Sequence, residues 1–147
     1  MNHRPAHDET APSRDRASLA LGSILCAYAL DSAGFALHHV VCQTLVRILE
    51  TPHAETNATM LPHTMEAMRS RAPDAIGSLA RALGTDPDGI APRITELGGG
   101  PRTLGELGAS VDRVDAALEG ILARPELANT PDPPRREELR QLLESAW

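Results

Sequence analysis

The stretch Phe35-Ala-Leu-His-His-Val-Val-Cys-Gln-Thr-Leu45, followed by Thr51-Pro-His-Ala54, decides the fold. Its first part is apolar at helical spacing and carries an adjacent histidine pair. In the second part, threonine before proline is a typical helix start, with Thr51 as the cap and Pro52 in the first turn. The stretch therefore predicts two consecutive helices with histidines near their junction.

The same reasoning, extended outward, predicts helices along the whole chain. Proline and glycine mark most of the boundaries, Ser13 and Ser110 are candidate caps, and Pro62 predicts a kink. Aromatic residues make up only 2% of the chain, which favours helices over strands. We expect an all-α single domain over residues 14–147 after a flexible arm at 1–13, with helices at 14–30, 35–49, 53–70, 73–83, 87–97, 111–123 and 135–146.

Composition excludes several functions. All 14 basic residues are arginine, which removes Schiff-base lysine chemistry and a P-loop lysine. A net charge of −6 argues against non-specific nucleic-acid binding. Polar residues interrupt the apolar stretch 17–49, so we expect no membrane span, and the first residues do not resemble a signal peptide. We expect a cytoplasmic protein with two buried thiols, Cys26 and Cys42.

The histidine pattern resembles the metal-binding segment of iron-type (group III) alcohol dehydrogenases, most closely their maleylacetate reductase branch. The resemblance is carried by Gly34-Phe-Ala-Leu-His-His39, Pro52-His-Ala54 and Leu61-Pro-His63. It continues in Ile94–Gly98, Leu104–Gly108 and Leu142–Trp147. It implies a helical bundle like the α domain of the dehydroquinate synthase-like and iron-type alcohol dehydrogenase fold, truncated because the nucleotide-binding α/β half is missing.

The resemblance also implies site residues. The family holds its metal between an aspartate and three histidines, and His39 and His53 match two of these ligands. The family's catalytic histidine is replaced by Gln43, one helical turn after His39. Two histidines would form an incomplete site that binds a divalent ion, iron or zinc, weakly. His38 and His63 are further pocket candidates, and no Gly-x-Gly-x-x-Gly follows a strand, so we expect no NAD(P) binding by this chain alone.

Structural alternatives exist for each histidine. In an apolar helix, His38 and His39 could be hydrogen-bonded core residues, and His53 could be a helix-start residue without a role. At a helix N-terminus, however, the dipole favours neutral imidazole, which can act as a base or a ligand.

Three functions remain open on the sequence alone. The first, which we favour here, is a stand-alone non-redox enzyme of isomerase, cyclase, dehydratase or hydrolase type. In it, His39 and His53 would exchange protons with a small-molecule substrate that Gln43 orients. The second is the metal-binding subunit of a split reductase, and the third is a non-catalytic ligand-binding or scaffold protein. In all three we expect a homo-oligomer such as a dimer, or a partner chain, to cover an exposed apolar face.

Overall fold

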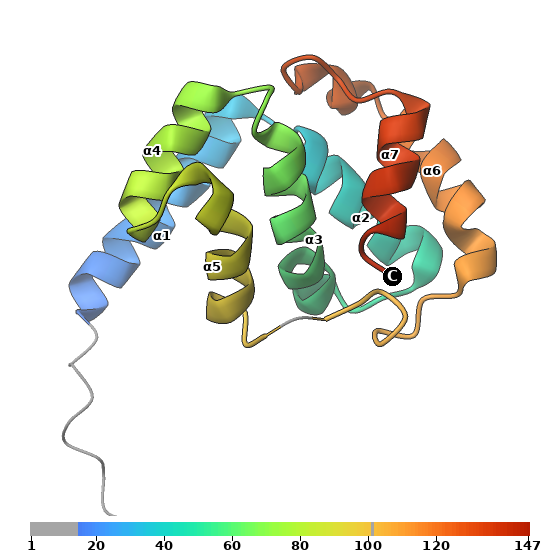
Figure 1. Cartoon of the computed structure of the whole chain (residues 1–147), viewed down its shortest axis with the longest axis horizontal. Coiled ribbons are helices and arrows are strands. Elements are labelled where there is room, and N and C mark those ends of the chain that lie inside the picture. Colours follow the sequence, from blue (N-terminus) through green and yellow to red (C-terminus); the bar gives the residue numbers. More distant parts are fainter. Residues whose placement is uncertain (1–14, 101) are drawn as a thin grey trace, which may run out of the picture. The chain divides into compact units, whose positions relative to one another are not determined.

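The computed structural model describes residues 15–100 and 102–147, and within these ranges the chain forms helices and no strand (Figure 1). This confirms the all-α prediction. The elements are α1 (Arg16–Ala33), α2 (Leu37–Leu49), α3 (His53–Met68), α4 (Pro73–Leu83), the 3-10 helix η1 (Pro87–Gly89), α5 (Ile90–Leu97), η2 (Val111–Arg113), α6 (Val114–Leu122), η3 (Pro125–Asn129) and α7 (Arg136–Glu144).

The chain divides into two compact units, Met1–Gly34 and Phe35–Trp147. The first contains α1, and the second contains all the other helices. The proposed single domain over residues 14–147 stays a prediction. The proposed arm at 1–13, together with the cap at Ser13, lies outside the described residues.

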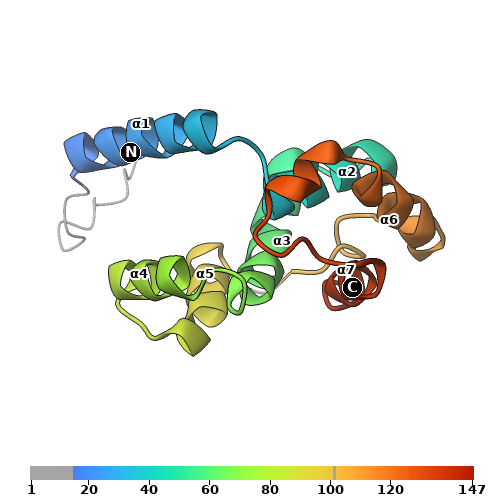
Figure 2. The ribbon, with the colours of Figure 1, turned by 90° about the horizontal axis from the view of Figure 1, so that it is seen from above.

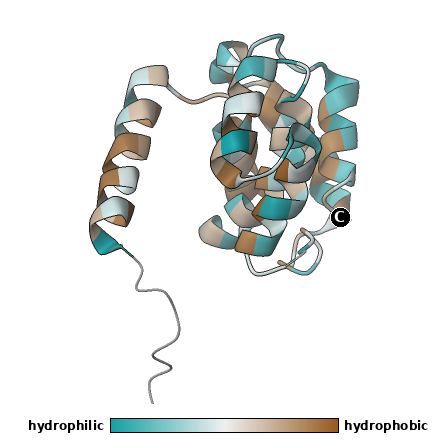
Figure 3. Ribbon diagram, turned by 60° about the vertical axis from the view of Figure 1, so that its left-hand side comes forward, coloured by the Kyte–Doolittle hydropathy of each residue, from teal (hydrophilic) through white to brown (hydrophobic). Residues whose placement is uncertain are grey.

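Helix α1 begins after Asp15, whose carboxylate accepts hydrogen bonds from the backbone amides of Ala17 and Ser18. It ends at Gly34, which has a positive φ of 75°. None of its residues is buried, and apolar residues run along the helix (Figure 3). Cys26 is exposed, so the prediction of two buried thiols is wrong for Cys26 and confirmed for Cys42. No single described helix is long and apolar enough to cross a membrane, although α1 and α2 pass on length and composition if counted together across their break.

Helix α2 is the central buried element of the second unit. It starts at Leu37, two residues later than predicted, because of contacts with residues distant in the sequence. Asn129 donates a 2.8 Å hydrogen bond to the carbonyl of Phe35, and Thr130 accepts one of 2.9 Å from the amide of Leu37. Distant side chains therefore satisfy one backbone group just before the helix and one at its first residue.

Helix α3 begins at His53 as predicted and continues through Pro62 to Met68. Pro52 occupies the N-cap position, so Thr51 lies one residue too early to cap the helix. Its hydroxyl instead accepts a 2.8 Å hydrogen bond from Thr56. This contact anchors the first turn of the helix on which His53 lies.

The remaining helices enclose α2 and α3. Ser110 precedes η2 without a side-chain cap bond, so α6 starts only at Val114. Thr103–Leu107 forms a turn, in which Thr103 and Glu106 exchange hydrogen bonds and Leu104 is fully buried. The largest fully buried apolar side chains of the unit are Leu37, Leu45, Met60, Ile90, Leu104, Leu118, Ile121, Leu139 and Leu143.

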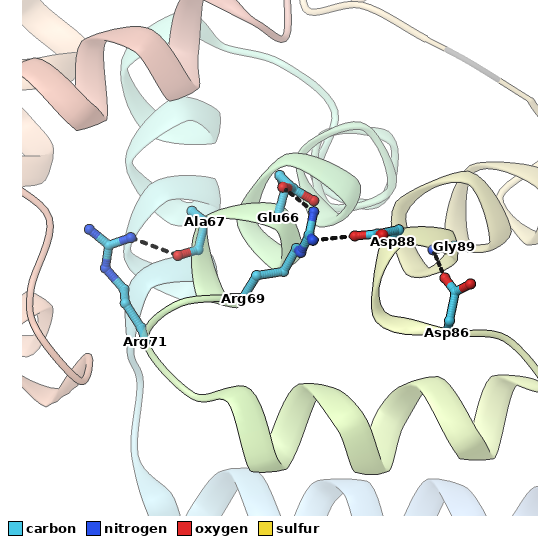
Figure 4. Close-up of polar contacts among 7 residues, drawn as sticks. All are labelled: Glu66, Ala67, Arg69, Arg71, Asp86, Asp88 and Gly89. Carbon is cyan, nitrogen blue, oxygen red and sulfur yellow. Dashed lines mark hydrogen bonds and ion pairs between the residues drawn. The ribbon is translucent and has the colours of Figure 1, made fainter.

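Arginines join segments that are distant in sequence (Figure 4). Arg69, just after α3, pairs with Glu66 and with Asp88 of η1. Arg71 donates a 2.6 Å hydrogen bond to the carbonyl of Ala67 and a 2.8 Å hydrogen bond to the carbonyl of Asp132. Each exposed ion pair contributes little to the free energy of unfolding, so these pairs help to fix the relative position of the segments more than they stabilise the fold.

Candidate functional site

Two of the predicted site residues lie together at the start of α2. The ring of His39 stacks on that of Phe35, with centroids 5.1 Å apart and planes at 18°. It meets the ring of His38 edge to face, at 5.6 Å and 85°. His39 is thus held by aromatic neighbours and is only partly buried.

His38 is tied into the unit. Thr64 donates its hydroxyl hydrogen to backbone carbonyls of its own helix, so its oxygen accepts from the Nδ1–H of His38 at 3.0 Å. Burial, and to a lesser extent the neighbouring charge of His39, lower the pKa of His38 to about 4, although a hydrogen bond with Asn57 opposes the shift. His38 is therefore neutral at pH 7 and holds α2 against α3.

Asn57 connects this pair to His53. Its amide donates a 2.7 Å hydrogen bond to the backbone carbonyl of His53 and lies 3.5 Å from Nε2 of the same residue. Its side chain also forms a hydrogen bond that raises the pKa of His38, so His38, its neighbour His39 and His53 share one neighbourhood. His53 itself is exposed. Sequence analysis missed Asn57, although its position one turn after His53 places both on one helix face.

Gln43 lies one turn beyond His39 on α2 and is partly buried. Its Oε1 accepts a 3.2 Å hydrogen bond from Arg124, whose guanidinium also pairs with Glu126 at 2.9 Å. The amide oxygen is thereby occupied, and the NH2 group is the part left to donate to a ligand. No local signal points to Arg124, since it is 81 residues away from Gln43.

His63 lies elsewhere on α3. Its Nδ1 is 2.9 Å from the hydroxyl of Ser145, and burial lowers its pKa. It lines a cavity of about 310 Å³ whose lining includes none of the other predicted site residues. A role for His63 beside His39 stays a prediction.

The donor set is too small for a complete metal centre. Within residues 15–100 and 102–147, no three His, Cys, Asp or Glu side chains come together as ligands. Burial raises the pKa of Cys42 to about 12, so this thiol beside His38 is not a thiolate ligand. His39 and His53 fit a divalent ion in kind but not in number, because such ions take three or four protein ligands.

Comparison with known proteins identifies the family. The C-terminal family model of the Fe-containing alcohol dehydrogenases matches residues 2–147. Maleylacetate reductase 1 of Rhodococcus opacus is 37% identical over 136 residues, which cover 91% of this chain and 37% of the relative. A maleylacetate reductase of a Rhizobium species is 33% identical over 143 residues, or 95% of this chain and 39% of the relative.

Solved structures agree. An iron-containing alcohol dehydrogenase from Corynebacterium glutamicum superposes with a TM-score of 0.69 and 36% identity, over 77% of this chain and 32% of that one. Maleylacetate reductase from Agrobacterium tumefaciens superposes with a TM-score of 0.67 and 33% identity, over 78% of this chain and 32% of that one. The chain thus spans less than two fifths of the length of these curated relatives. It belongs to the iron-containing alcohol dehydrogenase family and corresponds to the C-terminal helical part of its maleylacetate reductase-like members.

Proposed function

We propose that this chain supplies the helical, metal-binding part of an iron-dependent reductase acting on maleylacetate or a similar small oxo acid. The supporting observation is the neighbourhood that His38, His39, His53 and Asn57 form where α2 and α3 begin. The substrate class follows from the names of the relatives, which are maleylacetate reductases. None of these observations supports a non-redox isomerase, cyclase, dehydratase or hydrolase activity, or activity of the chain by itself.

Residues of the described chain have distinct parts in this proposal. His39 and His53 would donate imidazole nitrogens to an iron or zinc ion, which when bound would polarise the carbonyl of a substrate. His38 and Asn57 position these rings, and Gln43, oriented by Arg124, donates a hydrogen bond to the substrate. The remaining metal ligands and the nicotinamide cofactor would come from a nucleotide-binding α/β partner.

Metal binding tests this proposal directly. The wild-type chain, equilibrated with Fe²⁺ under anaerobic conditions and separately with Zn²⁺, is expected to bind weakly, with affinity that falls at least tenfold in both His39→Ala and His53→Ala. The expectation follows because each variant removes one of two ligands. The matched control is His63→Ala, which alters a histidine in a separate cavity and should leave metal affinity unchanged.

The reductase assignment has its own assay. NADH oxidation with maleylacetate is measured for the chain alone and after co-expression with the N-terminal part of the Rhodococcus opacus relative. We expect turnover only in the second case, and only with His39 and His53 intact. Metal affinity that survives in the His39→Ala/His53→Ala double variant would refute the site, whatever the activity.

A further inference from the structure

The cavity that His63 lines is separate from the histidines of the proposed metal site and lies in the second unit beside α3. Helix α3 lies between α5 and α7 in both views (Figures 1 and 2). The cavity of about 310 Å³ opens where α3 meets the loop after α5 and the end of α7. Its lining combines a few polar side chains with apolar ones and contains no carboxylate side chain.

The cation of this cavity is Arg102. No Asp or Glu of the described chain forms an ion pair with it, whereas eight such pairs engage other arginines. Its guanidinium lies over Gly99, where an added Cβ would be 3.7 Å from Nη2. Gly99 has φ of 91°, a conformation that favours glycine. The backbone is thus shaped so that the arginine lies close against the loop, at the cavity.

A histidine and a serine face the same space. The hydroxyl of Ser145 donates to the carbonyl of Leu142 at 2.8 Å, so the Nδ1 of His63 supplies the hydrogen of their 2.9 Å contact. This fixes the tautomer of His63 and leaves Nε2 as its second polar atom. Burial lowers the pKa of His63 and so disfavours its charged form, whereas an anion arriving beside it would favour that form.

Thr59 adds an independent sign of an unfilled site. It lines the cavity, its exposed fraction is 4%, and its Oγ1 is the one buried side-chain polar atom without a hydrogen-bond partner among the described residues. A buried hydroxyl left unpaired costs about 1–3 kcal/mol. A polar group bound in the cavity could supply the missing partner.

We propose that this cavity binds a small organic carboxylate. The planar guanidinium of Arg102 matches the two oxygens of a carboxylate, with the Thr59 hydroxyl, and the Nε2–H of His63 in its charged form, as further donors. Ala58, Pro62 and Ala146 form apolar walls that suit a short carbon chain better than a bare inorganic anion. The volume lies at the small end of ligand sites.

The chain carries its own reporter for the test. Trp147, its single tryptophan, follows the lining residues Ser145 and Ala146 and packs on Gly105. Sodium butyrate and inorganic phosphate are titrated separately at constant ionic strength, following Trp147 fluorescence and the backbone amide signals of residues 98–100, 102 and 103. Butyrate is expected to give a saturable change in both, with at least tenfold weaker binding in Arg102→Gln. The matched control, Arg113→Gln, alters an arginine outside the lining and should bind like wild type.

Thr59→Val supplies a second measurement. If Thr59 bonds to the ligand, this variant binds butyrate several-fold more weakly, yet unfolds at a higher temperature because an unsatisfied buried hydroxyl is gone. The proposal is overturned if butyrate binding does not saturate, if Arg102→Gln binds as well as wild type, or if phosphate binds more tightly than butyrate. These outcomes do not depend on metal binding at His39 and His53.

Discussion

At the scale of single residues, His38 makes stability depend on pH. Its pKa in the folded chain, about 4, is below the unfolded value of 6.5, so between these values the unfolded chain binds more protons. The stability contributed by neutral His38 is complete above pH 6.5 and is lost as the pH falls toward 4. From pH 7 to pH 5 we expect a loss of about 1–2 kcal/mol from this group.

Urea unfolding at both pH values measures this loss. In His38→Gln the pH-dependent loss of stability should be smaller than in wild type by that amount. Equal losses in the two proteins would show that His38 does not titrate differently on folding.

The sequence predicted some features of the candidate site and not others. The helical placement of His39, His53 and Gln43 is confirmed, because the pattern that singles them out lies within continuous stretches of helix, whereas their roles stay a prediction. Arg124 could not be predicted, because its contact with Gln43 joins residues 81 positions apart. Arg102 in its glycine-rich loop could not be predicted either, since Ser145 and His63 reach the same cavity only through tertiary packing.

At the scale of elements, the packing of α6 on α2 depends on the absence of a side chain at Gly120. A Cβ there would lie 2.6 Å from Cδ1 of Ile48 and 2.9 Å from Cγ2 of Thr44. Gly120→Ala should therefore destabilise the chain by about 1–2 kcal/mol, overpacking outweighing the better helix propensity of alanine. The control, Gly77→Ala in α4, meets only Arg81 at 3.7 Å and should stabilise by about 0.5–1 kcal/mol. Thermal unfolding measures both, and a stabilising Gly120→Ala would contradict the close approach.

Element boundaries show what local pattern can and cannot determine. Pro73 and Gly84 bound α4 as predicted, since both act through their own backbone preferences. The start of α2 was wrong by two residues because Asn129 and Thr130 bond to the backbone ahead of it. Helical spacing places Leu21, Leu25 and Tyr28 of α1 on one face, but spacing carries no information about what that face contacts.

At the scale of the whole molecule, α1 presents an exposed apolar face. Leu21, Leu25 and Tyr28, spaced by four and three residues, have exposed fractions of 57%, 57% and 72%. Without a partner chain, we expect wild-type protein to self-associate through this face, because contiguous exposed apolar surface favours burial in a symmetric contact.

Sedimentation equilibrium of wild type and Leu21→Ser/Leu25→Ser should show at least tenfold weaker self-association in the double variant. The control is Leu97→Ser, which removes a leucine of similar exposure, 62%, at the end of α5 rather than on α1 and should associate like wild type. A monomeric wild-type chain, or an equal effect of Leu97→Ser, would contradict a role for α1. Adding the nucleotide-binding part of a relative then distinguishes a second copy of this chain from a partner chain as the occupant of the α1 face. If the added part binds this face in place of the second copy, self-association of wild type decreases. If it binds elsewhere, self-association is unchanged.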